Sequence, residues 1–130
     1  MTNKALIAAA ILIFAIGGVH SWLGERRLIG PLLAPERRQG LLAKSFFARQ
    51  VLRFAWHLTS LAWWGMGMIV AALAFSSIGG QERLVLGIVA ATFLLTGGIT
   101  LIVSRGRHLA WPIFLAIAGL SAAPLLQTWP

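Results

Sequence analysis

The sequence predicts an all-α membrane protein, a bundle of four transmembrane helices with an interfacial helix in the first cytoplasmic loop. Three observations predict this fold class. The 130 residues are 58% hydrophobic and 11% charged, whereas a soluble domain carries about 25% charged residues. Four apolar runs of about 18–22 residues contain no Asp, Glu, Lys or Arg, and each is long enough to cross a hydrocarbon core of about 30 Å. None of the runs alternates as barrel strands do. The backbone N–H and C=O groups in the lipid must therefore be hydrogen-bonded within helices.

The predicted spans are 5–22, 54–75, 84–103 and 109–126, and they form a single transmembrane domain over residues 1–130. The first span resembles a signal peptide in length. A signal peptide, however, has basic residues before its apolar stretch, whereas here Lys4 alone precedes it and Arg26 and Arg27 follow it. We therefore expect the first span to be a retained helix.

The loop between the first two spans is expected to contain an interfacial helix. Pro31 and Pro35 interrupt the chain early, and Pro35 suits the first turn of a helix. Apolar residues then alternate irregularly with basic ones, namely Leu41, Leu42, Phe46 and Phe47 with Lys44 and Arg49. Such a segment places its apolar side chains in the acyl boundary and its basic ones among anionic headgroups.

The distribution of charge predicts the orientation. Nine of the eleven basic residues lie on one side of the four-span topology, and Lys4 and Arg83 lie on the other. The positive-inside rule then predicts a multi-pass protein of the bacterial inner membrane with both termini outside and the long loop in the cytoplasm. Trp22, Trp56 and Trp111 are expected at the cytoplasmic interface and Trp129 at the outer one. The nine residues are Arg26, Arg27, Arg37, Arg38, Lys44, Arg49, Arg53, Arg105 and Arg107.

Composition excludes several kinds of site. Cysteine is absent, which removes disulfides, thiolate metal ligands and thiol nucleophiles. The net charge of +8 formally suggests a nucleic-acid partner, but a basic cytoplasmic rim on a membrane protein already accounts for it. Ser60 lies one turn after His57, yet no G-x-S-x-G motif and no third orienting group accompanies it.

The three histidines are the residues with the most chemical interest. The topology brings His20, His57 and His108 to the same leaflet, and Glu25 lies just beyond the first span. Two interpretations are open. In the first, at least two histidines share zinc, another divalent metal or haem, with Glu25 as a further ligand or as the orienting partner of a ring. In the second, each histidine is a structural hydrogen-bonding group, and no H-x-x-x-H pair argues otherwise.

The second span presents one further arrangement. Arg53, His57 and Trp64 fall on one helical face, which indicates either an anion or quinone headgroup site with Trp64 as its aromatic platform, or an arginine and an indole that only snorkel and pack. Glu25 lies within reach of Arg53 or Arg26. We expect a structural ion pair there, because a single acid offers no acid–base couple.

The stretches His20-Ser21-Trp22-Leu23-Gly24-Glu25-Arg26 and Arg53-Phe54-Ala55-Trp56-His57-Leu58-Thr59-Ser60 resemble those of short four-helix inner-membrane proteins of bacteria. The resemblance covers the first half of the chain best and implies no activity. It marks the two segments that contain the first two histidines.

Taken together, these patterns predict a non-catalytic membrane module. Its expected partners are anionic lipids, which the nine basic residues would bind, or other subunits of a membrane complex or a homo-oligomer. The alternative is a metal- or haem-binding protein, or a metal-dependent enzyme acting on a lipid or quinone, that uses the histidines.

Overall fold

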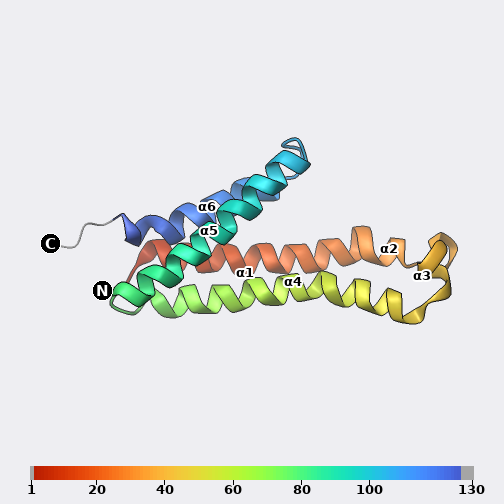
Figure 1. Ribbon diagram of the computed structural model, residues 1–130, viewed down its shortest axis with the longest axis horizontal. Helices are drawn as coiled ribbons and strands as arrows, with labels where there is room; N and C mark the ends of the chain where they lie inside the picture. Colours follow the sequence, from red (N-terminus) through yellow and green to blue (C-terminus); the bar gives the residue numbers. More distant parts are fainter. Residues whose placement is uncertain (1, 127–130) are drawn as a thin grey trace.

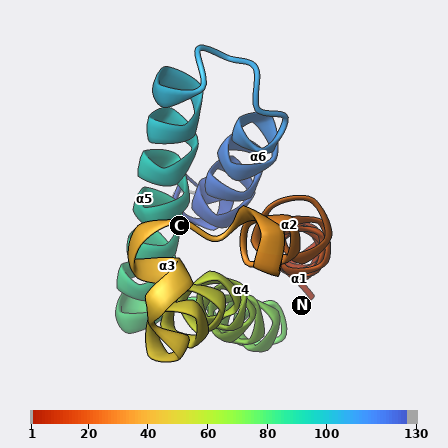
Figure 2. The same cartoon turned by 90° about the vertical axis from the view of Figure 1, so that its right-hand side faces the viewer.

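Helices make up the folded chain. The computed structural model describes residues 2–126, and no strand occurs within that range. α1 (Lys4–Gly24) and α4 (Phe46–Leu73) lie side by side and antiparallel. α5 (Gly80–Val103) and α6 (Ala110–Ala122) form a second hairpin that crosses the first at an angle (Figure 1 and Figure 2). The predicted all-α class is confirmed.

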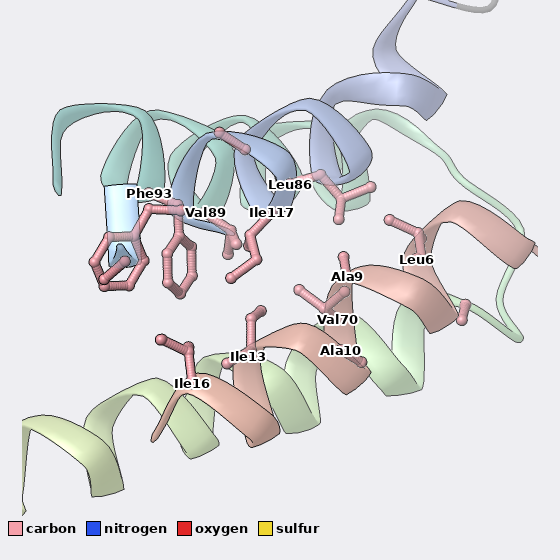
Figure 3. Close-up of a cluster of buried hydrophobic side chains, with 14 residues drawn as sticks. Leu6, Ala9, Ala10, Ile13, Ile16, Val70, Leu86, Val89, Phe93 and Ile117 are labelled. Atoms are coloured by element: carbon pink, nitrogen blue, oxygen red, sulfur yellow. The ribbon is translucent and has the colours of Figure 1, made fainter. Parts of the chain in front are cut away.

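The hydrophobic core lies where the two hairpins meet, and the first half of α1 runs through it. Leu6, Ala9, Ile13 and Ile16 are buried there at a spacing of three or four residues, which is one face of a helix. They pack on side chains of the other three long helices (Figure 3), namely Val70, Ala74, Leu86, Val89, Phe93, Phe114, Ile117 and Ala118. Beyond this core the two hairpins diverge (Figure 1).

Hydrogen bonds fasten the hairpins at the end where α1 begins. The Asn3 side chain accepts from the first backbone N–H groups of α1. The backbone N–H of Asn3 donates to the Ala74 carbonyl at 2.8 Å. Arg83 at the start of α5 donates to the carbonyls of Pro124 at 3.2 Å and Leu125 at 2.7 Å. We call this end, marked by Asn3, Ala74, Arg83 and Leu125, the closed end.

The outward faces of the long helices are apolar. Large aliphatic and aromatic side chains are exposed along α1, α4 and α5, and Leu109 is exposed just before α6; the others include Ile11, Leu61, Met68, Ile88, Leu95 and Ile102. Within residues 2–126 two segments, Lys4–Leu32 and Gly80–Val103, are long and apolar enough to cross a membrane, and Ala110–Leu125 is a shorter apolar helix. α4 has sufficient length, but its tryptophans, His57, Thr59 and Ser60 lower its mean hydropathy.

The predicted loop 24–53 is much shorter in the structure. α1 continues through a π-helical turn, η1 (Glu25–Ile29), into α2 (Gly30–Leu32). The Gly30 N–H donates to the Glu25 carbonyl, a wider turn than an α-helix makes. Pro31 follows immediately, in the first turn of α2, where its missing N–H costs little. Pro31, which was expected to interrupt the loop, instead lies in the helical continuation of α1.

A continuous interfacial helix from Pro35 onward is not present. A 3₁₀ turn, η2 (Pro35–Arg37), and a short helix, α3 (Gly40–Lys44), take its place, separated by extended backbone at Arg38 and Gln39. Ser45 then begins a new helix, because its hydroxyl accepts from the Ala48 N–H. The structure consequently places Phe46 and Phe47 in α4, eight residues earlier than the predicted start of the second span.

The segment 109–126, predicted as the fourth span, contains α6 followed by a 3₁₀ turn, η3 (Ala123–Leu125). The first and third predicted spans, 5–22 and 84–103, lie within α1 and α5. Trp129, which was expected at the outer interface, lies outside the described residues.

Candidate functional site

One carboxylate organises a polar network at the far end of α1. Glu25 stands at the first position of the π-helical turn. Its Oε1 lies 2.9 Å from Arg53 Nη2 in an ion pair, and its Oε2 lies 3.1 Å from His57 Nε2. Arg53 and His57 are one turn apart on α4, so a single helix face presents both donors. The sequence suggested Arg53 or Arg26 as the partner of Glu25, and the structure pairs it with Arg53.

His57 uses both of its ring nitrogens in this network. Its Nδ1 lies 2.7 Å from the Ser21 hydroxyl oxygen. An ionised Glu25 carboxylate only accepts hydrogen bonds, so Nε2 carries the proton that faces Glu25, and Nδ1 faces the Ser21 hydroxyl. Ser21 and Glu25 are four residues apart on α1 and its π-helical continuation, which places them on the same side toward α4. His57 therefore keeps no free nitrogen for a ligand.

His20 stands in a separate, aromatic environment. Its ring stacks on Trp56 with a centroid distance of 4.4 Å and an interplanar angle of 8°, and it meets Trp63 edge-on at 4.9 Å. The Trp56 indole N–H donates to the His20 carbonyl at 3.1 Å. Gly24 makes this possible, because a Cβ at that position would overlap the Trp56 ring. His20 Nε2 is buried and has no hydrogen-bond partner.

A cavity of about 390 Å³ lies between the diverging hairpins. α1 lines it with His20 and its neighbours, α4 with Trp56 and Trp63, and α5 with Thr96 and Thr100. His108, in the turn before α6, lines the same cavity. Its Nδ1 accepts from the Ala110 N–H at 3.2 Å, so the neutral ring carries its proton on Nε2.

The three predicted histidines thus lie toward one end but in two groups. His20 and His108 share the cavity, whereas His57 belongs to the Glu25 network. Within residues 2–126 no group of three or more His, Cys, Asp or Glu side chains is placed to hold a metal ion. Glu25, the expected fourth ligand, is engaged by Arg53 and His57.

Trp64, which the sequence suggested as an aromatic platform, contacts α1. Its indole N–H donates to the Phe14 carbonyl at 3.1 Å, and the ring lies over Gly17 of α1. The side chain therefore packs against α1. In the described part of the chain, the cation–π contacts join Arg26 to Trp22 and Arg49 to Phe46.

The basic residues named by the sequence lie at the end opposite the closed end, and we call this set the basic end. Two of them are tied to nearby carbonyls: Arg38 donates to Leu33 at 2.6 Å and Arg49 to Leu42 at 2.8 Å. Arg53 pairs with Glu25. The remaining members are exposed. The basic end consists of Arg26, Arg27, Arg37, Arg38, Lys44, Arg49, Arg53, Arg105 and Arg107.

Sequence reasoning missed Ser21, Gly24 and Trp63 as members of the site. The spacing of four between Ser21 and Glu25 was a usable signal, since it places a hydroxyl and a carboxylate on one helical face. The role of Gly24 had no signal in the sequence, because it depends on which residue of α4 lies opposite. No family model, curated protein or solved structure matches this chain.

Proposed function

We propose that this protein is a small four-span protein of the bacterial inner membrane, without catalytic activity, that binds anionic lipid through its basic end. Both termini lie outside, and the segment from Leu33 to Ser45 lies in the cytoplasm. The observation that carries the proposal is the segregation of charge: the helices carry nine basic residues to one end and leave Lys4 and Arg83 at the closed end.

Helix length supports the placement of the basic end among headgroups. About 20 residues of helix cross a hydrocarbon core of about 30 Å. Counted from Lys4, that length ends near Leu23, and counted back from Leu73 on α4 it ends near Phe54. The Glu25–Arg53 ion pair then falls just outside the hydrocarbon, which suits side chains that are 34% and 43% exposed.

Apolar outward faces support four spans. In the second hairpin, α5 turns exposed leucine and isoleucine side chains outward, and Leu109 is exposed just before α6. An exposed apolar face of this kind is unfavourable in water. The segment Ala110–Leu125 is about 24 Å long at 1.5 Å per residue. The segment is about 6 Å shorter than the hydrocarbon core of about 30 Å. Local thinning of the bilayer accommodates such a difference at a cost of a fraction of a kcal/mol per Å.

Several cations of the basic end remain available to lipid phosphates. Within residues 2–126 the ion pairs are those of Glu25 with Arg53 and His57. The exposed side chains without such a partner are Arg26, Arg27, Arg37, Lys44, Arg105 and Arg107. Each basic residue near an anionic surface contributes about 1 kcal/mol, an attraction that salt screens.

The Glu25 network does not favour an enzyme. The order serine–histidine–carboxylate is that of a hydrolytic triad. Ser21, however, lies inside α1, where the neighbouring backbone N–H groups are bonded to carbonyls of the helix and cannot stabilise an oxyanion. The Glu25 carboxylate also neutralises Arg53 at 2.9 Å. We assign the network the role of joining α1 to α4.

The metal- or haem-binding alternative loses support from the same geometry. It relied on His20 and His57 as joint ligands, and His57 has both nitrogens occupied by Ser21 and Glu25. A shared ion requires a free nitrogen from each ring within about 2.1 Å of the metal.

Reconstitution in nanodiscs tests the proposal. Thermal unfolding of the wild-type protein is compared in neutral phosphatidylcholine and in phosphatidylcholine containing phosphatidylglycerol, at low and high salt. We expect stabilisation by the anionic lipid that weakens with salt. Replacing Arg26, Arg27, Arg37 and Lys44 by Gln is expected to abolish most of this stabilisation, whereas Lys4→Gln at the closed end leaves it intact. Equal stabilisation of the fourfold variant and the wild type would refute lipid binding through the basic end.

A further inference from the structure

The cavity between the hairpins has an uncharged lining. None of the residues that line it is acidic or basic apart from the two histidines. Its mouth is apolar, since Val19, Leu23 and Leu28 border it and are themselves exposed. Transfer of an ion into such surroundings is strongly unfavourable. The cavity is therefore suited to a neutral, lipid-soluble ligand, and the charged headgroups bound at the basic end are excluded from it.

The polar groups of the cavity select a hydrogen-bond acceptor. The hydroxyls of Thr96 and Thr100 donate to carbonyls one turn earlier in α5, at 2.8 Å and 2.7 Å. Neutral His108 presents an N–H at Nε2, because its Nδ1 already accepts from Ala110. His20 Nε2 is buried without a partner, a state that costs free energy until a polar atom meets it. The ligand should therefore offer an acceptor atom to His108 and a polar atom to His20 Nε2.

The walls select a flat ring. Trp56 and Trp63 enclose His20, and Trp63 in turn meets Phe114 edge-on with a centroid distance of 5.2 Å. Aromatic walls favour stacked or edge-on contacts with a second ring over contacts with a flexible alkyl chain. A volume of about 390 Å³ lies at the lower end of the range for ligand sites, which suits one or two fused rings rather than a macrocycle.

We propose that this cavity binds the head ring of an isoprenoid quinone. One ring carbonyl accepts from His108 Nε2, the other accepts from His20 in its Nε2–H tautomer, and the apolar tail leaves through the mouth at Val19 and Leu28 into the acyl region. The inference rests on the proposed insertion in the membrane and is independent of lipid binding at the basic end.

Quenching of tryptophan fluorescence by decylubiquinone tests the site, because Trp56 and Trp63 line it. The purified protein is titrated in detergent micelles and, in parallel, with 1-decanol, which has the alkyl tail without the ring. We expect saturable quenching by decylubiquinone that 1-decanol does not reverse. Equal competition by 1-decanol would identify a site for alkyl chains and overturn the proposal.

A matched pair of variants locates the binding. Thr96→Phe fills the cavity, and Thr92→Phe makes the same change one turn earlier on α5, outside the cavity. We expect Thr96→Phe to abolish saturable quenching and Thr92→Phe to preserve it. Retained binding in Thr96→Phe, with the fold intact by circular dichroism, would overturn the proposal.

A second pair tests the hydrogen bond. His108→Leu is expected to weaken decylubiquinone binding about tenfold through loss of the donor, and His108→Gln, which keeps an N–H, is expected to recover most of it. His57→Gln, outside the cavity, is expected to leave the affinity unchanged. Haemin is titrated as well: a sharp Soret band that His108→Leu abolishes, together with displacement of decylubiquinone, would assign the cavity to haem and refute the quinone.

Discussion

Gly24 is the position at which a single methyl group should disturb the site most. Its Cα faces the Trp56 indole so closely that a Cβ would overlap the ring. The indole cannot move aside freely, since it stacks on His20 and donates to the His20 carbonyl. Gly24→Ala therefore either strains the helix pair or displaces the indole from both contacts.

The two routes have similar costs. Overpacking typically costs about 1–3 kcal/mol. Displacement forfeits a hydrogen bond of about 0.5–1.5 kcal/mol and an aromatic pair of about 0.5–1.5 kcal/mol. Gly→Ala also raises helix propensity by about 1 kcal/mol, so the matched control is Gly18→Ala on the same helix, where a Cβ meets nothing within 4 Å. The propensity gain is common to both variants, and Gly24→Ala should be less stable than Gly18→Ala by about 1–3 kcal/mol.

The free energy of unfolding is measured for both variants by titration with sodium dodecyl sulfate in a mild detergent, with tryptophan fluorescence as the readout. A double-mutant cycle with Trp56→Ala then isolates the contact, because without the indole Gly24→Ala has nothing to displace. If the two glycine variants are equally stable, or if the penalty at Gly24 persists without Trp56, the close packing of α1 on Trp56 is refuted.

The helices themselves follow from hydrophobic run length, which is a local property. The end of α1 and the start of α4 do not follow from run length. The sequence places the end of the first helix near Trp22 because the apolar run stops there, before the charges of Glu25 and Arg26. In the structure the helix continues through a π-helical turn into the segment that contains Pro31, and Glu25 forms an ion pair with Arg53 of α4. The contact of Glu25 depends on a partner helix, so hydropathy read along one segment cannot reveal it.

The histidines illustrate the same limit in the candidate site. Topology alone predicts that His20 and His57 lie at similar depth on neighbouring helices. Which way each ring turns depends on what lies opposite it. Ser21 and Glu25 hold His57 through both nitrogens, whereas Trp56 and Trp63 enclose His20 beside the cavity. The pairing of His20 with His108 requires the divergence of the two hairpins, which no spacing in the sequence encodes.

Two further predictions concern charge and orientation. Glu25→Gln removes the charge that Arg53 faces and should lower the free energy of unfolding by about 1 kcal/mol or less, because both side chains are partly exposed and screened by solvent. The control is Glu36→Gln, which has no ion pair within residues 2–126 and should leave the free energy of unfolding unchanged. Equal losses in the two variants would show that the ion pair does not stabilise the fold. Because the chain has no cysteine, single cysteines report orientation without background. The segregation of basic residues places Lys44 in the cytoplasm and Ser77 outside. An impermeant maleimide applied to intact spheroplasts should therefore label Ser77→Cys and spare Lys44→Cys, and detergent should expose both. Labelling of Lys44→Cys in intact spheroplasts would mean that the basic end faces outward, and the orientation inferred from charge would be wrong.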